Sequence, residues 1–334
     1  MTILYESAVP NPNELFIRGP QPLLCDWQGK KALQLGGQEG SLLVVPGLSL
    51  AQGWVEVDLG SEGAAYPGIA FRLRDSLNYE LAYIQPHTSG QWDALQYDPV
   101  FHGSNTWQLY YGSQAQQAVD VPVQTWHHLR VEFQGQTARI RVGQQEPLVV
   151  RQLAHSHPTG LLGLWTFLPA YFANLRVGDD AVDFGLGTEP APNPELPAGT
   201  VREWFLEGFG VVGAEANGIL NLNRYLPVSE QAVRLTREMR VDEAGEFVFH
   251  LGFSDEITFQ IDGEEVFTGE NLFHVSPKWE ERGYVRPDQA VSRYLSQGTH
   301  RLTAVLKARE FFGFGLALRL EGAGYGWLPA ELCS

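Results

Sequence analysis

The sequence predicts an all-β protein made of two antiparallel β-sandwich (jelly-roll) domains joined by a proline-rich linker. Three observations lead to this fold class. Apolar and polar residues alternate with a period of two along much of the chain, as in strands that bury one face. The 334 residues include 36 glycines and 20 prolines without a fixed period, which is typical of many short strands joined by turns. No segment shows the extended 3.6-residue periodicity of a long amphipathic helix.

A proline-rich segment divides the chain. Four prolines between residues 190 and 197 alternate with acidic and small residues. Proline lacks an amide donor and keeps the backbone extended, so this segment is expected to be a semi-rigid linker. We expect a first domain over residues 1–180, a linker over 181–199 and a second domain over 200–334.

Alternation is clearest near the start of the first domain. Val55, Val57 and Leu59 are expected on one face of a strand, with Glu56 and Asp58 on the other. Turn residues separate such segments about every 8 to 12 residues, the spacing of a sandwich. The strands expected in this domain cover residues 54–59, 68–73, 78–84, 106–112, 126–133, 137–142, 161–167 and 171–177.

The second domain shows the same alternation. Asp262-Gly263 separates two alternating segments and suits the central positions of a type I′ hairpin turn, which require positive φ angles. Helical turns are expected only around residues 228–238 and 287–295. The strands expected here cover residues 245–253, 257–261, 264–269, 300–308 and 312–322.

Charge argues against several classes of partner. There are 39 acidic and 23 basic residues, which give a net charge of −16. Such a surface repels phosphate backbones and anionic membranes, so neither nucleic-acid binding nor membrane insertion is expected. No secretory signal is visible, which predicts a cytoplasmic location. Cys25 and Cys333 lie near opposite ends, lack the spacing of a zinc site, and are expected to be thiols.

One segment is similar to a glycosidase signature. EVDLGSE, residues 56–62, resembles the ExDxE or ExDxxE pattern of laminarinase-type enzymes, although Glu62 comes one residue late. Same-face carboxylates on a strand lie roughly 6.5 to 7 Å apart and point in parallel, whereas a retaining pair faces across the sugar at about 5 to 5.5 Å. The catalytic candidates are Glu56 and Asp58, or Asp93 with another acid, but hydrolysis at Glu56 and Asp58 is not expected.

A second motif matches the pattern of a dinucleotide-binding site. Residues 208–213, GFGVVG, match the dinucleotide-binding pattern GxGxxG. That site requires a following helix, which Asn217-Gly218 would interrupt, so a glycine-bearing strand or bend is expected instead. No cofactor is predicted.

The densest group of aromatic and polar side chains lies between residues 79 and 112. Aromatic rings can cover the C–H face of a sugar while amides and carboxylates bind its hydroxyls, although sandwich cores also contain many such rings. The candidate ligand-binding residues are Arg72, Tyr83, Gln85, Asp93, Gln96, Tyr97, His102, Asn105, Trp107 and Tyr110. Those expected around one solvent-accessible concavity of the first domain are Arg72, Tyr83, Gln96, Trp107 and Tyr110.

Four segments of the first domain resemble the concanavalin A-like lectin/glucanase superfamily, especially its LamG-like and laminarinase-like domains. They are FRLRDSLNYELAYIQPH, DALQYDPVFHGSNTWQLYYG, WHHLRVEFQGQTARIRV and GLLGLWTFLPAYFANLRV, within about residues 30–178. The resemblance implies two curved antiparallel sheets whose concave face or rim loops bind glycans, sometimes with calcium. A basic residue often stands in such domains where this chain has Gln85.

The second domain resembles galactose-binding-like or protective-antigen-type sandwich modules. The similar segments are GEFVFHLGFSDEITFQIDGEEVF and LSQGTHRLTAVL. Calcium-dependent sugar sites of such modules use adjacent aspartates, whereas Ser254-Asp255-Glu256 stands here. Asp255 and Glu256 are therefore the candidate metal ligands, and calcium binding is not predicted.

Together these observations favour a carbohydrate-binding, lectin-like protein. The first alternative is a glycoside hydrolase, which would need two acids about 5 to 10 Å apart in an open cleft, one of them with a raised pKa. The second alternative is a structural or interaction module. An exposed apolar patch without convergent polar groups would favour this alternative.

Overall fold

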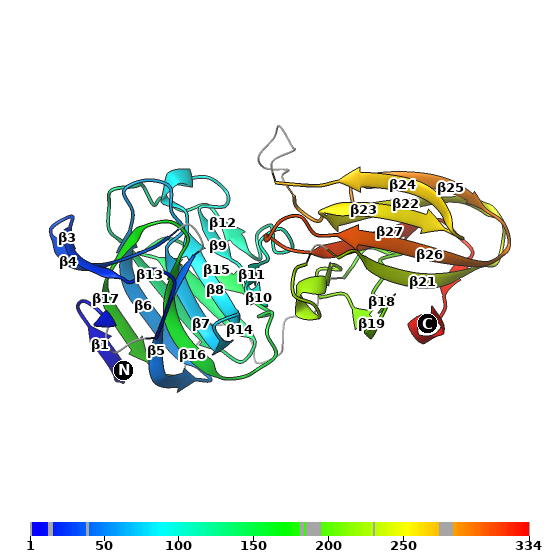
Figure 1. Cartoon of the computed structure of the whole chain (residues 1–334). Coiled ribbons are helices and arrows are strands. Elements are labelled where there is room, and N and C mark those ends of the chain that lie inside the picture. Colours follow the sequence, from blue (N-terminus) through cyan, green and yellow to red (C-terminus); the bar gives the residue numbers. More distant parts are fainter. Residues whose placement is uncertain are drawn as a thin grey trace. The chain divides into compact units, whose positions relative to one another are not determined.

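The fold is all-β, as the sequence predicts. A computed structural model describes residues 2–12, 16–37, 40–180, 184, 195–229, 231–273 and 283–333 (Figure 1). Within these residues the sheets are built from antiparallel strands, and the helical elements are short 3-10 turns. Most of the expected linker, residues 181–199, lies outside the described part of the chain.

The chain divides into two compact units. The first comprises residues 1–103 and 110–191, and the second comprises residues 104–109 and 192–334. Ser104–Leu109, which includes strand β11 (Ser104–Asn105), thus belongs to the second unit although both of its flanking segments belong to the first. Nothing in the sequence patterning predicts this insertion.

The first unit contains two sheets. One has the order β15-β14-β13-β6-β17-β4-β3, with β1 also paired to β17, and the other contains β10-β8-β7-β16-β5-β2, with β9 on β8 and β12 on β9. The strands of the first sheet are β1 (Ile3–Ser7), β3 (Leu23–Trp27), β4 (Lys30–Leu35), β6 (Gly53–Gly60), β13 (His127–Gln134), β14 (Thr137–Val142), β15 (Leu148–Val150) and β17 (Ala170–Gly178). Those of the second are β2 (Phe16–Arg18), β5 (Ser41–Leu50), β7 (Gly68–Asp75), β8 (Asn78–Ile84), β9 (Leu95–Tyr97), β10 (Val100–Phe101), β12 (Gln116–Gln117) and β16 (Gly160–Thr166).

The two sheets of the first unit bury apolar side chains between them. Val55 and Val57 of β6 are at most 1% exposed, and the rings of Phe71 on β7 and Phe133 on β13 lie 5.5 Å apart between centroids. The sheet that contains β7 also buries its second face, where Tyr79 and Trp165 belong to another apolar cluster. The open polar face of this sandwich therefore belongs to the sheet that contains β6.

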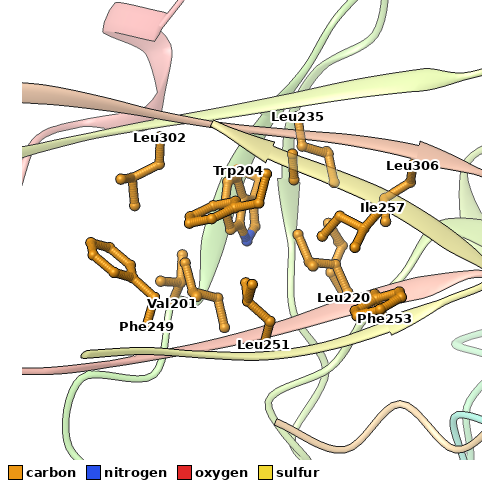
Figure 2. Close-up of a cluster of buried hydrophobic side chains, with 14 of the residues drawn as sticks. Val201, Trp204, Leu220, Leu235, Phe249, Leu251, Phe253, Ile257, Leu302 and Leu306 are labelled. Atoms are coloured by element: carbon orange, nitrogen blue, oxygen red, sulfur yellow. The ribbon is translucent and has the colours of Figure 1, made fainter. Parts of the chain in front are cut away.

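The second unit is a separate sandwich (Figure 1). Its sheets have the orders β19-β18-β21-β26-β23-β24, with β28 on β21, and β20-β27-β22-β25. Their strands are β18 (Glu203–Leu206), β19 (Gly210–Gly213), β20 (Leu220–Asn221), β21 (Val233–Val241), β22 (Gly245–Ser254), β23 (Glu256–Ile261), β24 (Glu264–Glu270), β25 (Gln289–Leu295), β26 (Gly298–Lys307), β27 (Gly315–Glu321) and β28 (Tyr325–Trp327). Figure 2 shows the core between these sheets, with Trp204, Phe249 and Leu302 among its side chains.

Two local predictions in the second unit are confirmed. Asp262 and Gly263 have φ angles of 53° and 82° and join β23 to β24, as a type I′ turn requires. The GFGVVG segment forms part of the turn after β18 and the strand β19, which pairs with β18, instead of opening a helix.

The helical turns expected around residues 228–238 and 287–295 are wrong, because most of these residues lie in β21 and β25. β21 pairs along its whole length with β26, and this tertiary pairing outweighs the local helix propensity of its charged residues. Across the described ranges, no helix has the length and apolar character needed to cross a membrane.

Candidate functional site

Charged side chains gather on the side of the β6 sheet that faces away from the second sheet. We call it the charged face. Residues directly opposite on neighbouring strands share a face, and Glu56 lies opposite Arg130 and Arg176 while Asp58 lies opposite His128. The charged face consists of Lys30, Glu56, Asp58, His128, Arg130, Glu132, Arg139, Arg141, Asn174 and Arg176.

Glu56 is held at the centre of the charged face by three cationic side chains. It pairs with Arg130 and with Arg176 Nη1, the latter at 2.7 Å, and His128 Nε2 lies 3.6 Å away. His128 and Arg130 lower the pKa of Glu56 to about 2, against the opposing effect of burial. Glu56 is therefore a permanent anion at neutral pH.

Asp58 accepts hydrogen bonds from three different strands. Lys30 Nζ and Asn174 Nδ2 each lie 2.7 Å from Oδ2, and His128 Nδ1 lies 2.9 Å from Oδ1. Burial raises the pKa of Asp58, but the bonds from His128, Lys30 and Asn174 outweigh burial and lower it overall. Asp58 and Glu56 in turn raise the pKa of His128 to about 9, so this imidazole is positively charged at neutral pH.

These two carboxylates do not form an acid–base pair. Glycoside hydrolysis needs one carboxyl group that keeps its proton at the working pH, and both Glu56 and Asp58 have lowered pKa values. They can accept hydrogen bonds and balance cations, but neither has a proton to donate.

An aromatic cluster adjoins the Asp58 end of the charged face. Trp27 stacks on Tyr171 with 4.5 Å between ring centroids and meets the edge of Trp126 at 4.7 Å. Trp27 can lie on β6 because Gly60 has no side chain: a Cβ there would be 2.5 Å from the indole. Trp126 and Tyr171 are partly exposed, and Lys30 Nζ lies 5.0 Å from a ring of Trp126. Aromatic surface and fixed polar groups thus lie side by side.

None of the candidate residues predicted from the sequence belongs to this aromatic cluster. Trp27, Trp126 and Tyr171 come from three distant segments, and none of them belongs to a recognisable motif. The one usable signal was the opposite charge of the polar positions on two expected strands, Glu56 with Asp58 and His128 with Arg130, which favours cross-strand pairing.

The expected concavity built from Tyr83, Gln96 and Tyr110 is wrong, because these side chains are buried. Tyr83 and Gln96 are at most 4% exposed, and the Tyr83 hydroxyl donates to Gln96 Oε1 at 3.1 Å. Tyr97, another candidate, is 1% exposed; its hydroxyl donates to Glu80 at 2.7 Å. Alternation correctly placed Tyr83 on a strand, β8, but the face of the sheet that carries Tyr83 is covered.

Arg72 is also buried, for a backbone reason. Its φ angle is +47°, and the pairing register of β7 with β8 shifts after Phe71. The side chain consequently lies over the ring of Phe133 in the other sheet, and its Nη2 donates to the carbonyl oxygens of Ala51 at 3.0 Å and Gly135 at 2.5 Å. This irregularity moves Arg72 from the expected surface into the inter-sheet core.

Two further candidates, Asn105 and Trp107, fall in the inserted segment and so belong to the second unit. Trp107 meets the edges of Phe273 and Tyr284, with centroids 5.6 and 5.3 Å away. Trp107 thus packs against side chains of the second unit. His102 lies just before this segment and is exposed.

Gln85 and Asp93 form a buried pair near the turn η2 (Pro86–Thr88). Gln85 Nε2 donates to the Asp93 carbonyl oxygen at 2.7 Å and approaches Oδ2 at 3.3 Å. Among the described residues, Asp93 Oδ1 has no hydrogen-bond partner, and burial raises the pKa of this carboxyl group to about 6. Asp93 is a candidate acid, but the contacts described around it include no second carboxylate.

We expect Asp93→Asn to stabilise the protein above pH 6. Because the folded pKa of Asp93 is about 6 and its ordinary value is 3.8, the folded state binds the proton more tightly than the unfolded state does. Stability linked to this proton is therefore lost as the pH rises from about 4 through 6. Asparagine removes the buried charge and should raise the free energy of unfolding by about 1 to 3 kcal/mol at pH 8.

Urea unfolding of both proteins at pH 4 and pH 8 measures this effect. The difference between them should shrink towards pH 4. A variant less stable than the wild type at pH 8 would mean that the Asp93 carboxylate is stabilised in the folded state.

The two candidate metal ligands of the second unit have other roles. Asp255 is fully buried, its Oδ2 accepts from the backbone amides of Arg309 and Glu310 at 2.5 and 2.7 Å, and burial raises its pKa. Glu256 pairs with Arg309 and lines an open groove of about 470 Å³ together with Lys307. Over the ranges that the structure describes, no three metal-ligating side chains come together.

Comparison with known proteins finds similarity of fold. No family model matches the chain. No curated protein matches it either. Among solved structures, a protein of unknown function with a galectin-like fold from Bacillus subtilis is 10% identical, with 55% of this chain and 98% of that chain covered at a TM-score of 0.42.

Two other solved structures are also similar to part of this chain. The carbohydrate-binding module CBM66 from Bacillus subtilis is 18% identical, with 46% and 89% of the two chains covered at a TM-score of 0.36. A β-glucanase from Bacillus licheniformis is 11% identical, with 53% and 98% covered at 0.35. These are the kinds of protein that the sequence resemblance names, and at such identities and scores the likeness concerns the β-sandwich alone.

Proposed function

We propose that the protein binds carbohydrate on the charged face of its first unit, at the end where Trp126 and Tyr171 adjoin Asp58. One observation supports this site above others: partly exposed aromatic rings lie beside exposed polar groups whose positions are fixed by shared hydrogen bonds. A sugar presents apolar C–H faces and ring hydroxyls together, and this combination of surfaces complements both.

The polar groups at this site can bind hydroxyls in defined directions. Asn174 is exposed on β17, and Lys30 and His128 are 41% and 44% exposed, while all three donate to Asp58. Because Asp58 fixes their orientation, little side-chain entropy remains to be lost when a ligand binds. Trp126 would then support the apolar face of the sugar.

We expect Trp126→Ala to weaken glycan binding about tenfold, the scale of one lost aromatic contact. A glycan array identifies ligands of the wild-type protein, and titration calorimetry then gives their affinities for the variant. Phe209→Ala is the matched control, since Phe209 is 53% exposed but belongs to the second unit. Equal affinities of the wild type and Trp126→Ala would remove Trp126 from the site.

The same array separates the alternatives. Cleavage of the bound glycans, lost in Asp93→Asn, would support the hydrolase interpretation, because Asp93 is the candidate acid with a raised pKa. No binding to any glycan would favour a structural or interaction module.

A further inference from the structure

The charged face is positively charged, although the whole chain carries a net charge of −16. His128 counts among its cations because its pKa is raised to about 9. The cations are Lys30, His128, Arg130, Arg139, Arg141 and Arg176, and the carboxylates are Glu56, Asp58 and Glu132. Glu6, Glu62 and Asp180 add carboxylates at its margins, next to Arg176, Trp27 and Trp54 respectively. The excess of cations is therefore concentrated at the Arg141 end, where Arg130, Arg139 and Arg141 surround Glu132 and the local field attracts anions.

Arg141 differs from the other arginines of the charged face. Arg130, Arg139 and Arg176 each pair with a carboxylate, whereas Arg141 forms no ion pair or hydrogen bond with any residue in the described ranges. Arg141 also lies directly opposite Arg130 in the ladder between β13 and β14, where like charges repel. Arg130 has carboxylate partners, Glu56 and Glu132, which offset part of this repulsion, whereas Arg141 has no carboxylate partner of its own in the described ranges.

A partly exposed guanidinium in this position is suited to an external anion. It offers five donors in a planar fork that matches a carboxylate or sulfate group. Its anion would also neutralise the repulsion from Arg130. Arg141 is two strands away from Glu56, across Arg130 of β13, which corresponds to about 10 Å, and Asp58 lies two residues further along β6.

We propose that the charged face selects glycans that carry carboxylate or sulfate groups, and that Arg141 binds the anionic group. This inference rests on the proposed carbohydrate function and specifies its ligand class. Because of the separation between Arg141 and the Trp126 end, the ligand is an oligosaccharide whose neutral residue lies against Trp126 and whose acidic residue reaches Arg141.

The test is an array of matched pairs. Each uronate-containing, sialylated or sulfated oligosaccharide is printed beside its carboxyl-reduced or desulfated counterpart, and binding is measured for the wild type, Arg141→Gln and Arg74→Gln. Arg74 is the matched control because it is an arginine of the first unit that is 71% exposed, away from the charged face on β7. The wild type and Arg74→Gln should prefer the acidic members at least tenfold, and Arg141→Gln should lose this preference while it still binds the neutral members.

The outcomes separate this inference from the proposed function on which it rests. Equal binding of acidic and neutral members by the wild type would overturn the role of Arg141 and leave carbohydrate binding intact. Binding to no member would overturn both. A short DNA duplex or inorganic polyphosphate that binds as tightly as the best acidic glycan would also overturn the inference, because the face would then recognise charge without sugar. The two kinds of acidic member, carboxylated and sulfated, identify which anion Arg141 prefers.

Discussion

Trp107→Ala should destabilise the second unit by about 3 kcal/mol. The indole packs against Phe273, Tyr284 and Phe312, with centroids 5.3 to 5.6 Å away, and truncating a buried Trp costs about 3 to 5 kcal/mol. Partial exposure of Trp107 places the expected value at the lower end. Guanidinium unfolding followed by near-UV circular dichroism and by far-UV signal measures the loss.

Trp126→Ala is the control for this experiment. Trp126 is a partly exposed ring of the first unit, so its truncation should cost less than truncation of Trp107. If Trp107→Ala instead kept full stability and lost glycan binding, Trp107 would be a binding platform and not a core residue.

Glu56→Gln should lower the free energy of unfolding by about 3 kcal/mol at pH 7. The change leaves Arg130, Arg176 and His128 without their shared counter-charge, and breaking a buried ion pair costs about 3 to 5 kcal/mol. The folded pKa of Glu56 is about 2 and its ordinary value is 4.5, so the stabilisation is fully present above pH 4.5 and is lost as the pH falls to 2. The difference between wild type and variant should therefore disappear near pH 2.

Glu6→Gln is the matched control for Glu56. Glu6 also contacts Arg176, at 3.1 Å, but it is 60% exposed, and exposed pairs contribute at most about 1 kcal/mol. Urea unfolding of both variants from pH 2 to pH 8 makes the comparison. Equal effects of the two substitutions at pH 7 would contradict the central position that we assign to Glu56.

The sequence predicted most strands of both units, because alternation is a local property. The segment 54–59 is an example: Val55 and Val57 face the core, and Glu56 and Asp58 face outwards, as expected. Alternation cannot show whether the second face of a strand is covered, which is why Tyr83 was expected at a surface. Alternation also does not show a shift of pairing register, such as the shift after Phe71 that points the side chain of Arg72 into the core.

The candidate site was harder to predict, because it depends on which strands are neighbours. Lys30, Asp58, His128 and Asn174 come from four strands, and only the order β13-β6-β17-β4 brings them together. The inserted segment presents the same difficulty. Residues 106–112 were expected to be a strand of the first domain, whereas this range consists of turns, bends and irregular backbone and its first part belongs to the second unit.

Insertion of Ser104–Leu109 into the second unit has a topological consequence. Gln108 donates its backbone N–H to the Phe312 carbonyl oxygen and accepts from the Val285 N–H, both at 3.0 Å. The polypeptide therefore passes between the units three times: before Ser104, after Leu109, and again near residue 191. Part of the sequence of the second unit is therefore encoded within the first. Truncation or recombination of the gene at the proline-rich segment would separate the second unit from its residues 104–109.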